Sequence, residues 1–147
     1  MKYLVMLLAL LNFSCSSTKK TPLTSAEDDI LIYYSKSPCN GKCPVYDLWI
    51  FKDGSIAYSG INNVSVKGKI NKKLSKEEFE SLKATLTKDP KENITFKRKR
   101  DKSITTLNIN NKEYKYYTTS ASNYIKELDS KLKDIVSKIM QNTASTI

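Results

Sequence analysis

The stretch "VYDLWIFKDGSIAYSG", residues 45–60, holds two runs of β-branched and aromatic residues around an Asp-Gly pair. Such residues favour strands, and an Asp-Gly pair between two strand-like runs is a strong signal for a β-hairpin. Because strand side chains alternate between two faces, the first run has an apolar face and a mixed face. These faces carry Tyr46, Leu48 and Ile50 on one side and Asp47 and Trp49 on the other. The stretch therefore predicts an antiparallel hairpin.

Other strand-like runs extend this hairpin into a sheet. "ILIYY" at 30–34 predicts a strand before it. "VSVKGKI" at 64–70 predicts a strand after it, with valine and isoleucine on one side and lysine on the other. Residues 103–109 and 112–118 predict a second hairpin around the Asn-Asn pair that separates them, which suits a type I′ turn. The pattern is typical of an antiparallel meander.

Two segments have helical spacing instead. In "LSKEEFESLKATL", 74–86, Ser75 and Glu78 form a capping box that starts a helix, and the Pro90 that follows ends it. Residues 124–140 carry an apolar stripe compatible with a short coiled-coil seam, although beside a sheet it favours a helix packed by one face. Its members are Ile125, Leu128, Leu132, Ile135 and Ile139.

These elements predict one α+β domain over residues 30–140. Its antiparallel meander sheet has two helices packed on one face and a single core. Residues 141–147 are expected to form a disordered C-terminal tail. A chain of this length can bury only a modest core, so a covalent staple would stabilise it.

The first residues have the pattern of an export signal. Lys2 precedes an uncharged apolar run, Leu4–Leu11, that is shorter than the roughly 20 residues of a membrane-spanning helix. A basic start, a short apolar run and small residues are typical of a secretory signal, and a buried N-terminal helix is the alternative. The end of this segment, "LNFSC", resembles the lipobox of bacterial lipoproteins. That resemblance implies removal of residues 1–14 and acylation of Cys15; an ordinary signal that leaves Cys15 unmodified is the alternative.

A lipid on Cys15 would hold the protein at a membrane, because several acyl chains anchor a protein stably. Residues 15–29 are polar, contain Pro22 and lack periodic apolar positions, so they are expected to act as a flexible tether. Surface-exposed lipoproteins of Bacteroidota resemble one another in having acidic residues after the cysteine, whereas "SSTKK" is basic. We therefore expect the periplasmic face of the outer membrane.

Composition excludes several kinds of chemistry. The chain contains no histidine, so a Ser-His-Asp or Cys-His mechanism within it is impossible. No glycine-rich phosphate loop or cluster of metal ligands stands out, and we expect no catalytic residue, metal or cofactor. Asp47 is the one acid placed where burial would be informative, because it shares a strand face with Trp49.

Cys39 and Cys43 have three possible roles. A zinc site needs about four ligands, and two thiolates without histidine fall short. A thiol-disulfide enzyme usually has two residues between its cysteines and places them at a helix N-terminus, whereas here three residues separate them and a strand follows. Outside the cytoplasm such a pair tends to oxidise. The spacing favours a structural disulfide that closes a tight turn, with redox catalysis as the alternative.

A basic run, "KRKRDK" at 97–102, is the strongest charge feature of a chain whose net charge is +10. It could bind lipopolysaccharide cores, anionic lipid headgroups or nucleic acid, the last of which the compartment argues against. A solvated loop between the first helix and the last hairpin is the simpler interpretation. The candidate anion-binding residues are Lys97, Arg98, Lys99 and Arg100.

The whole pattern resembles a family of domains of unknown function that is common in Bacteroidota lipoproteins. Its members share Cys-x-Gly-x-Cys-Pro-x-Tyr, an Asp-Gly turn, a Tyr-x-Gly, a Leu-Ser helix start and an Asp before the last hairpin. The matching residues are Cys39, Gly41, Cys43, Pro44, Tyr46, Asp53, Gly54, Tyr58, Gly60, Leu74, Ser75 and Asp101. The resemblance covers residues 30–137 and implies the fold and the compartment but no activity.

Taken together, the sequence predicts a membrane-anchored envelope lipoprotein with a non-catalytic binding or structural domain. Its partner would be a protein or a glycan of the cell envelope. A thiol-disulfide oxidoreductase that uses Cys39 and Cys43 is one alternative, and a binder of anionic envelope components through the basic run is another.

Overall fold

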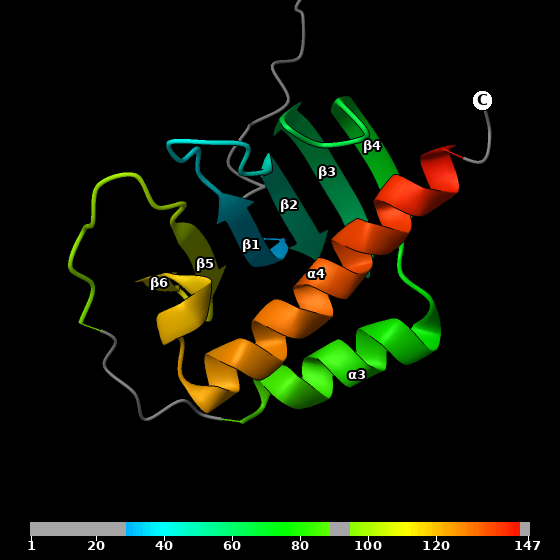
Figure 1. The fold of residues 1–147 in the computed structure, drawn as a ribbon. Coiled ribbons are helices and arrows are strands. Elements are labelled where there is room, and N and C mark those ends of the chain that lie inside the picture. The colour runs from blue at the N-terminus through cyan, green and yellow to red at the C-terminus, as the bar shows by residue number, and fades with distance from the viewer. Residues whose placement is uncertain (1–28, 89–94, 145–147) are drawn as a thin grey trace, which may run out of the picture.

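The computed structural model describes residues 29–88 and 95–144, and it contains a six-stranded antiparallel sheet with two α-helices (Figure 1). The strands lie in the order β4-β3-β2-β1-β5-β6. This arrangement confirms the predicted α+β class. The elements are β1 (Ile30–Lys36), β2 (Val45–Phe51), β3 (Ser55–Asn62), β4 (Gly68–Lys73), α3 (Lys76–Leu86), β5 (Thr105–Ile109), β6 (Lys112–Tyr116), a 3₁₀ turn (Thr118–Ser120) and α4 (Asn123–Ala144).

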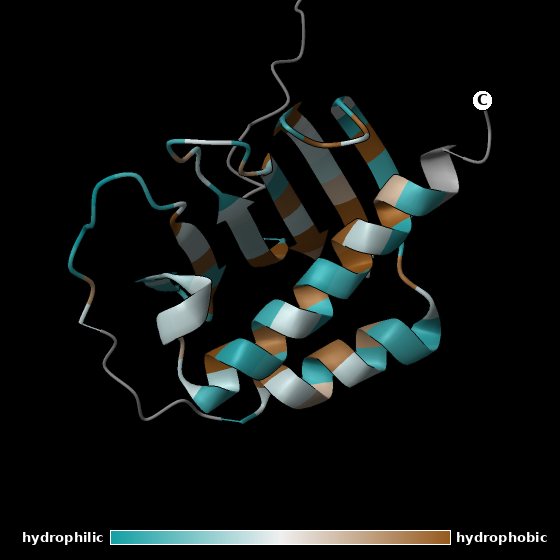
Figure 2. Cartoon of the chain, in the orientation of Figure 1, coloured by the Kyte–Doolittle hydropathy of each residue, from teal (hydrophilic) through white to brown (hydrophobic). Residues whose placement is uncertain are grey.

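Both helices cover the same face of the sheet (Figure 1). Hydrophobic and hydrophilic residues alternate along the strands (Figure 2), and one face of β1, β2, β3, β5 and β6 is buried under the helices, whereas the edge strand β4 has no fully buried residue. The predicted apolar face of β2 is buried, and so is the predicted stripe of α4. The opposite face of the sheet carries no helix among the described residues. The single predicted core therefore lies between the sheet and the two helices.

Local signals place α3 where the sequence predicts it. The Ser75 side chain accepts a hydrogen bond from the backbone N–H of Glu78, and the Glu78 carboxylate accepts one from the backbone N–H of Ser75. α3 then runs antiparallel to α4, because Lys138 pairs with Glu78 near the start of α3 while Glu127 pairs with Lys88 just after its end. These exposed pairs align two helices whose apolar sides face the sheet.

The predicted strand at 64–70 is wrong in its first half. β4 begins at Gly68, and the preceding residues form a bend that starts at Asn63, where φ is +52°. Within that bend the carbonyl of Val66 lies against Gly60, so closely that a Cβ at position 60 would collide with it. The chain therefore folds back over β3 before it pairs with it, and the bend occupies space that only a glycine leaves open.

At the C-terminal end, the described structure extends past the predicted domain. α4 continues to Ala144, four residues into the segment expected to be a tail. The signal at 1–14, Cys15 and the tether up to residue 28 lie outside the described residues. No helix of the described part is long and apolar enough to cross a bilayer.

Candidate binding site on the open face of the sheet

The face of the sheet opposite the helices presents a row of side chains that crosses all six strands. The strand register pairs Asn71 with Ala57, Ala57 with Trp49, Trp49 with Tyr33, Tyr33 with Asn108, and Asn108 with Glu113. Trp49 and Tyr33 occupy the two central strands and are each partly exposed. Asn108 and then Glu113 follow Tyr33 on one side, whereas Ala57 separates Trp49 from Asn71 on the other. The open face thus has an aromatic centre with hydrogen-bonding groups next to Tyr33 and at both ends of the row.

The two aromatic side chains are held in place by one another and by Asp47. Their ring centroids lie 5.4 Å apart with an angle of 39° between the planes. The Tyr33 hydroxyl donates a hydrogen bond of 2.8 Å to Oδ1 of Asp47, on the neighbouring strand. Partial burial raises the pKa of the Tyr33 phenol, and the hydrogen bond to Asp47 raises it further, so the hydroxyl stays protonated. Asp47 is half-buried, and its contact with Tyr33 gives it a role in orienting the platform.

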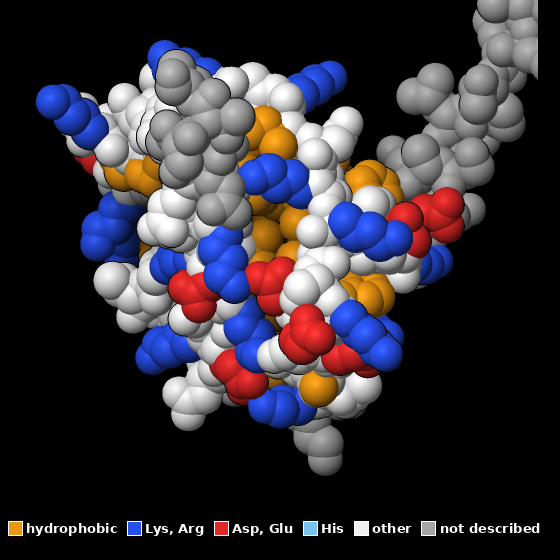
Figure 3. Space-filling model, turned by 90° about the vertical axis from the view of Figure 1, so that its right-hand side faces the viewer, with side chains coloured by type: hydrophobic (Ala, Val, Ile, Leu, Met, Phe, Trp, Pro, Cys, Tyr) orange, Lys and Arg blue, Asp and Glu red, His pale blue; other side chains and the backbone are white. Residues whose placement is uncertain are grey.

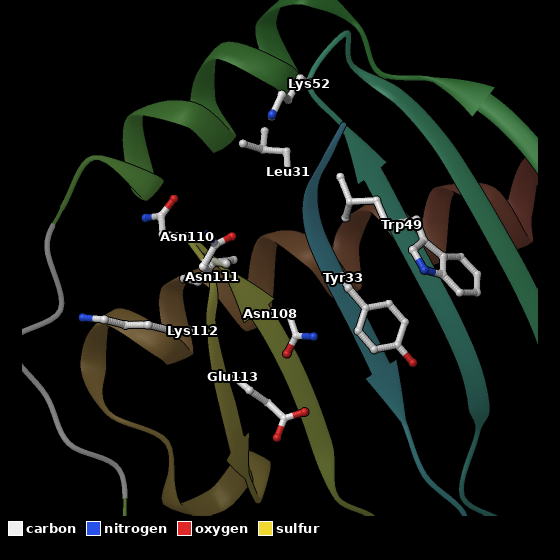
Figure 4. Close-up of a pocket in the computed structure, with 11 residues that line it drawn as sticks. Leu31, Tyr33, Trp49, Lys52, Asn108, Asn110, Asn111, Lys112 and Glu113 are labelled. Atoms are coloured by element: carbon white, nitrogen blue, oxygen red, sulfur yellow. The ribbon is translucent and has the colours of Figure 1, made fainter. Parts of the chain in front are cut away.

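A hollow of about 950 Å³ lies between this platform and the turn of the β5–β6 hairpin (Figure 4). Asn110 and Asn111 form that turn with φ of +50° and +59°, the left-handed geometry predicted for a type I′ hairpin. The lining residues are Ile30, Leu31, Tyr33, Trp49, Lys52, Asn108, Ile109, Asn110, Asn111, Lys112 and Glu113. Three amides, one carboxylate and the ammonium groups of Lys52 and Lys112 therefore line the same hollow as the aromatic rings, and each amide can both donate and accept hydrogen bonds.

The predicted disulfide is present between Cys39 and Cys43, whose Cα atoms lie 5.7 Å apart. It closes a turn between β1 and β2 that includes Gly41 at φ of +151°, a conformation that other residues rarely adopt. No helix starts at this turn, and β2 begins two residues after Cys43. The helix N-terminus that lowers the thiol pKa in thiol-disulfide enzymes is therefore missing at this pair.

The structure brings the basic run next to this disulfide. Lys97, Arg98, Lys99 and Arg100 are exposed. The run is attached to the domain through Tyr117, whose ring packs on Phe96 and whose hydroxyl accepts a hydrogen bond from the backbone N–H of Lys99. A hollow of about 780 Å³ separates the two loops, and it is lined by Ser37, Pro38, Cys39, Asn40, Arg98, Lys99, Arg100, Asp101, Lys102 and Ile104.

The family described as "Domain of unknown function (DUF6438)" matches residues 30–142, which include all the strands and both helices up to the last turn of α4. The chain belongs to this family. The match confirms the sequence-based expectation of a domain of unknown function, while the Bacteroidota origin and the shared motif stay predictions. No curated protein and no solved structure matches the chain.

The DUF6438 domain also contains a buried polar cluster that sequence reasoning missed. Oδ1 of Asp129, on α4, accepts hydrogen bonds from the hydroxyls of Tyr34 at 2.7 Å and Tyr116 at 3.0 Å. The Lys36 ammonium lies 3.3 Å from the same oxygen, and Lys133 pairs with Oδ2 at 2.5 Å. The sequence did contain a signal for this cluster, because alternation places Lys36 on the same strand face as the apolar Ile32 and the aromatic Tyr34. Asp129 interrupts the apolar stripe of α4 one position after Leu128.

Burial and charge oppose each other in this cluster. Burial lowers the pKa of Lys36 to about 8, although the attraction of Asp129 acts in the other direction. Burial also acts to raise the pKa of Asp129, but the hydrogen bond from Lys133, the charge of Lys36 and the Tyr34 hydroxyl together hold it below its usual value. Asp129 is therefore ionised at neutral pH. Among the described residues, no three Cys, Asp or Glu side chains come together in a way that could hold a metal ion.

Proposed function

We propose that this DUF6438 domain is a non-catalytic carbohydrate-binding module, held at a membrane of the cell envelope by a lipid on Cys15. The observation that carries the proposal is the row of side chains across the open face, with Tyr33 and Trp49 at its centre and the amide of Asn108 beside Tyr33. The domain would place this face against an envelope glycan.

The chemistry of the row fits a sugar ring better than an apolar or a strongly charged ligand. A sugar presents a face of C–H groups and a rim of hydroxyls. Aromatic rings supply an apolar surface of matching size, and neutral amides can donate to and accept from hydroxyls. Asn108, Asn110 and Asn111 supply three such amides within one lining. A few placed polar groups beside aromatic side chains are the usual composition of a ligand site.

The shape of the face supports a polymeric ligand. The row runs across all six strands, from Asn71 on the edge strand β4 to Glu113 on the other edge strand, β6. A chain of sugar rings could lie along it, whereas a small molecule is more often enclosed in a cavity. The proposed lipid anchor would be consistent with such a ligand, because a tethered domain meets only ligands of its own compartment.

Titration of the soluble domain with glycan fragments tests this proposal. Calorimetry of residues 16–147 with soluble peptidoglycan fragments, chitohexaose and dextran oligosaccharides should detect binding to at least one of them. Trp49→Ala should weaken that binding about tenfold or more, because it removes the larger ring. Phe96→Ala is the matched control, since Phe96 is a partly exposed aromatic residue outside the row. Equal affinity for both variants, or no binding by any probe, would overturn the proposal.

Intact mass measurement tests the anchor separately. Protein extracted from native membranes should begin at Cys15 and carry the mass of its acyl groups, and Cys15→Ser should release it from the membrane fraction. A soluble wild-type protein would contradict the anchor without affecting the carbohydrate site.

A second candidate function is the binding of phosphate-bearing envelope components by the basic run. The observation that favours it is the hollow lined by Arg98, Lys99, Arg100 and Lys102 beside the disulfide. Binding of lipopolysaccharide fragments should then weaken steeply with salt and be lost in Arg98→Gln, Arg100→Gln. Lys69→Gln, Lys73→Gln, which removes two exposed lysines of β4, is the control. Equal binding by both double variants would exclude this function.

A further inference from the structure

A third hollow, a groove, lies on the helix-covered side of the sheet, away from the proposed carbohydrate site. It has a volume of about 460 Å³, within the range of about 300–1,000 Å³ that small ligands occupy. The disulfide turn, the bend after β3 and the C-terminal half of α4 form its walls. The lining residues are Lys36, Cys43, Pro44, Tyr46, Asn63, Val64, Ser65, Ser103, Thr118, Lys133, Val136, Ser137 and Met140.

The charges around this groove do not balance. Its lining, as the structure describes it, includes Lys36 and Lys133 but no acid. Behind these lysines, the single carboxylate of Asp129 pairs with both, with Oδ1 toward Lys36 and Oδ2 toward Lys133. Two ammonium groups thus share one carboxylate, and one positive charge remains at the groove wall. A ligand with one negative charge would complete the cluster.

The two lysines differ in how much of their charge a ligand could reach. The Lys36 side chain is 8% exposed, and its ammonium also donates to the hydroxyls of Thr105 and Thr118. The Lys133 side chain is 40% exposed and has no hydrogen bond other than that to Asp129 among the contacts described. Lys133 is therefore the group that can contact an anion directly, while Lys36 contributes its charge from behind.

The rest of the groove is suited to an apolar body. Val64, Val136, Met140 and Pro44 supply hydrophobic surface, and Ser137 and Thr118 supply hydroxyls that can donate to an anion. Figure 3, which views the molecule from the side of β4 and the C-terminal end of α4, shows a band of hydrophobic side chains reaching the surface between charged ones. Apolar surface with a cation at one end matches an amphipathic anion.

We propose that this groove binds a small amphipathic monoanion, a carboxylate on a short apolar chain or ring, with the carboxylate beside Lys133. Its apolar body lies against Val136 and Met140 of α4 and Val64 of the bend. The proposal is independent of carbohydrate binding, because the row of Tyr33 and Trp49 lies on the opposite face of the sheet.

Amide chemical-shift titrations of the soluble domain with octanoate and with octanol test this proposal. Octanoate should shift residues around the groove and bind at least about tenfold more tightly than octanol, because a hydrogen bond to a charged group is among the stronger ones. Lys133→Gln should weaken octanoate about tenfold and leave octanol unchanged. Lys126→Gln, an exposed lysine elsewhere on α4, is the matched control and should leave both unchanged.

Because Lys133 also pairs with Asp129, a second variant separates binding from folding. Met140→Glu places a negative charge at the apolar wall without touching the ion cluster, and it should abolish octanoate binding in a folded domain. Equal affinity for octanoate and octanol, shifts confined to the open face, or binding unchanged in both variants would overturn the proposal.

Discussion

The ammonium group of Lys36, on the first strand, lies 3.3 Å from Oδ1 of Asp129, on the last helix, although the two residues are 93 positions apart in the chain. Both side chains are buried between the sheet and α4. The Lys36 ammonium also donates hydrogen bonds to the hydroxyls of Thr105 and Thr118. The Asp129 carboxylate also accepts hydrogen bonds from Tyr34 and Tyr116 and pairs with Lys133. The pair connects β1 to α4 through polar contacts in an otherwise apolar core.

Removing the charge of Asp129 should destabilise the domain strongly. Asp129→Asn leaves Lys36 as a buried ammonium without a counter-ion, and breaking a buried pair in this way costs about 3–5 kcal/mol. Urea denaturation followed by circular dichroism measures the change. Asp134→Asn, at an exposed position of the same helix, should stay within about 0.5 kcal/mol of the wild type. Similar losses in both variants would show that the cluster has no special role.

The pKa of Lys36 should make the domain more stable as the solution becomes moderately alkaline. Its pKa in the folded protein is about 8, against 10.5 ordinarily, so between these values the unfolded chain binds more protons. The free energy of unfolding then rises with pH, by at most about 1.4 kcal/mol per pH unit for one proton. Urea denaturation between pH 7.5 and 9.5 measures the slope. Above pH 10 the gain reverses, because burial raises the pKa of Tyr34 and Tyr116.

The variant Lys36→Met tests whether Lys36 causes this rise in stability with pH. It removes the titrating group, so its free energy of unfolding should not rise over the same interval, whatever its absolute stability. A rise that persists in Lys36→Met would assign the pH dependence to another group.

The disulfide should stabilise the turn without taking part in chemistry. Cys39→Ser, Cys43→Ser opens a five-residue ring, and the chain-entropy estimate gives a loss of about 2 kcal/mol. Thermal unfolding with and without reductant measures this loss, and ligand binding at the open face should be unchanged. Titration against glutathione buffers then separates the two roles, because rapid exchange at mild potentials would support the redox alternative instead.

Gly60 should be intolerant of any side chain. A Cβ there would collide with the carbonyl of Val66, and pushing the bend away should cost about 1–3 kcal/mol or more, as overpacking does. The same displacement should move Val64 and Ser65, which line the groove, and so weaken octanoate binding. Denaturation and chemical-shift titration of Gly60→Ala measure both effects. Ser59→Ala, one position away on the open face, should change neither.

The sequence was sufficient to predict elements whose causes are local. The Asn110-Asn111 turn, the capping box of Ser75 and Glu78, and the alternation along β2 all depend on neighbours a few residues away. The prediction of a strand at 64–70 was wrong in its first half for a non-local reason. Its alternation is real, but the chain must first fold back over Gly60, and that contact cannot be seen in the local pattern.

The aromatic row of the open face and the Lys36–Asp129 cluster both depend on the tertiary structure. Trp49 and Asp47 could be placed on one strand face from alternation alone, because side chains on a strand have a period of two. Only the strand order, with β1 between β2 and β5, aligns Trp49, Tyr33 and Asn108 in one row. Likewise, only the packing of α4 on the sheet brings Asp129 to Lys36. Local propensity decides which face a residue occupies, whereas register and packing join segments far apart in the chain and thereby decide which residues meet.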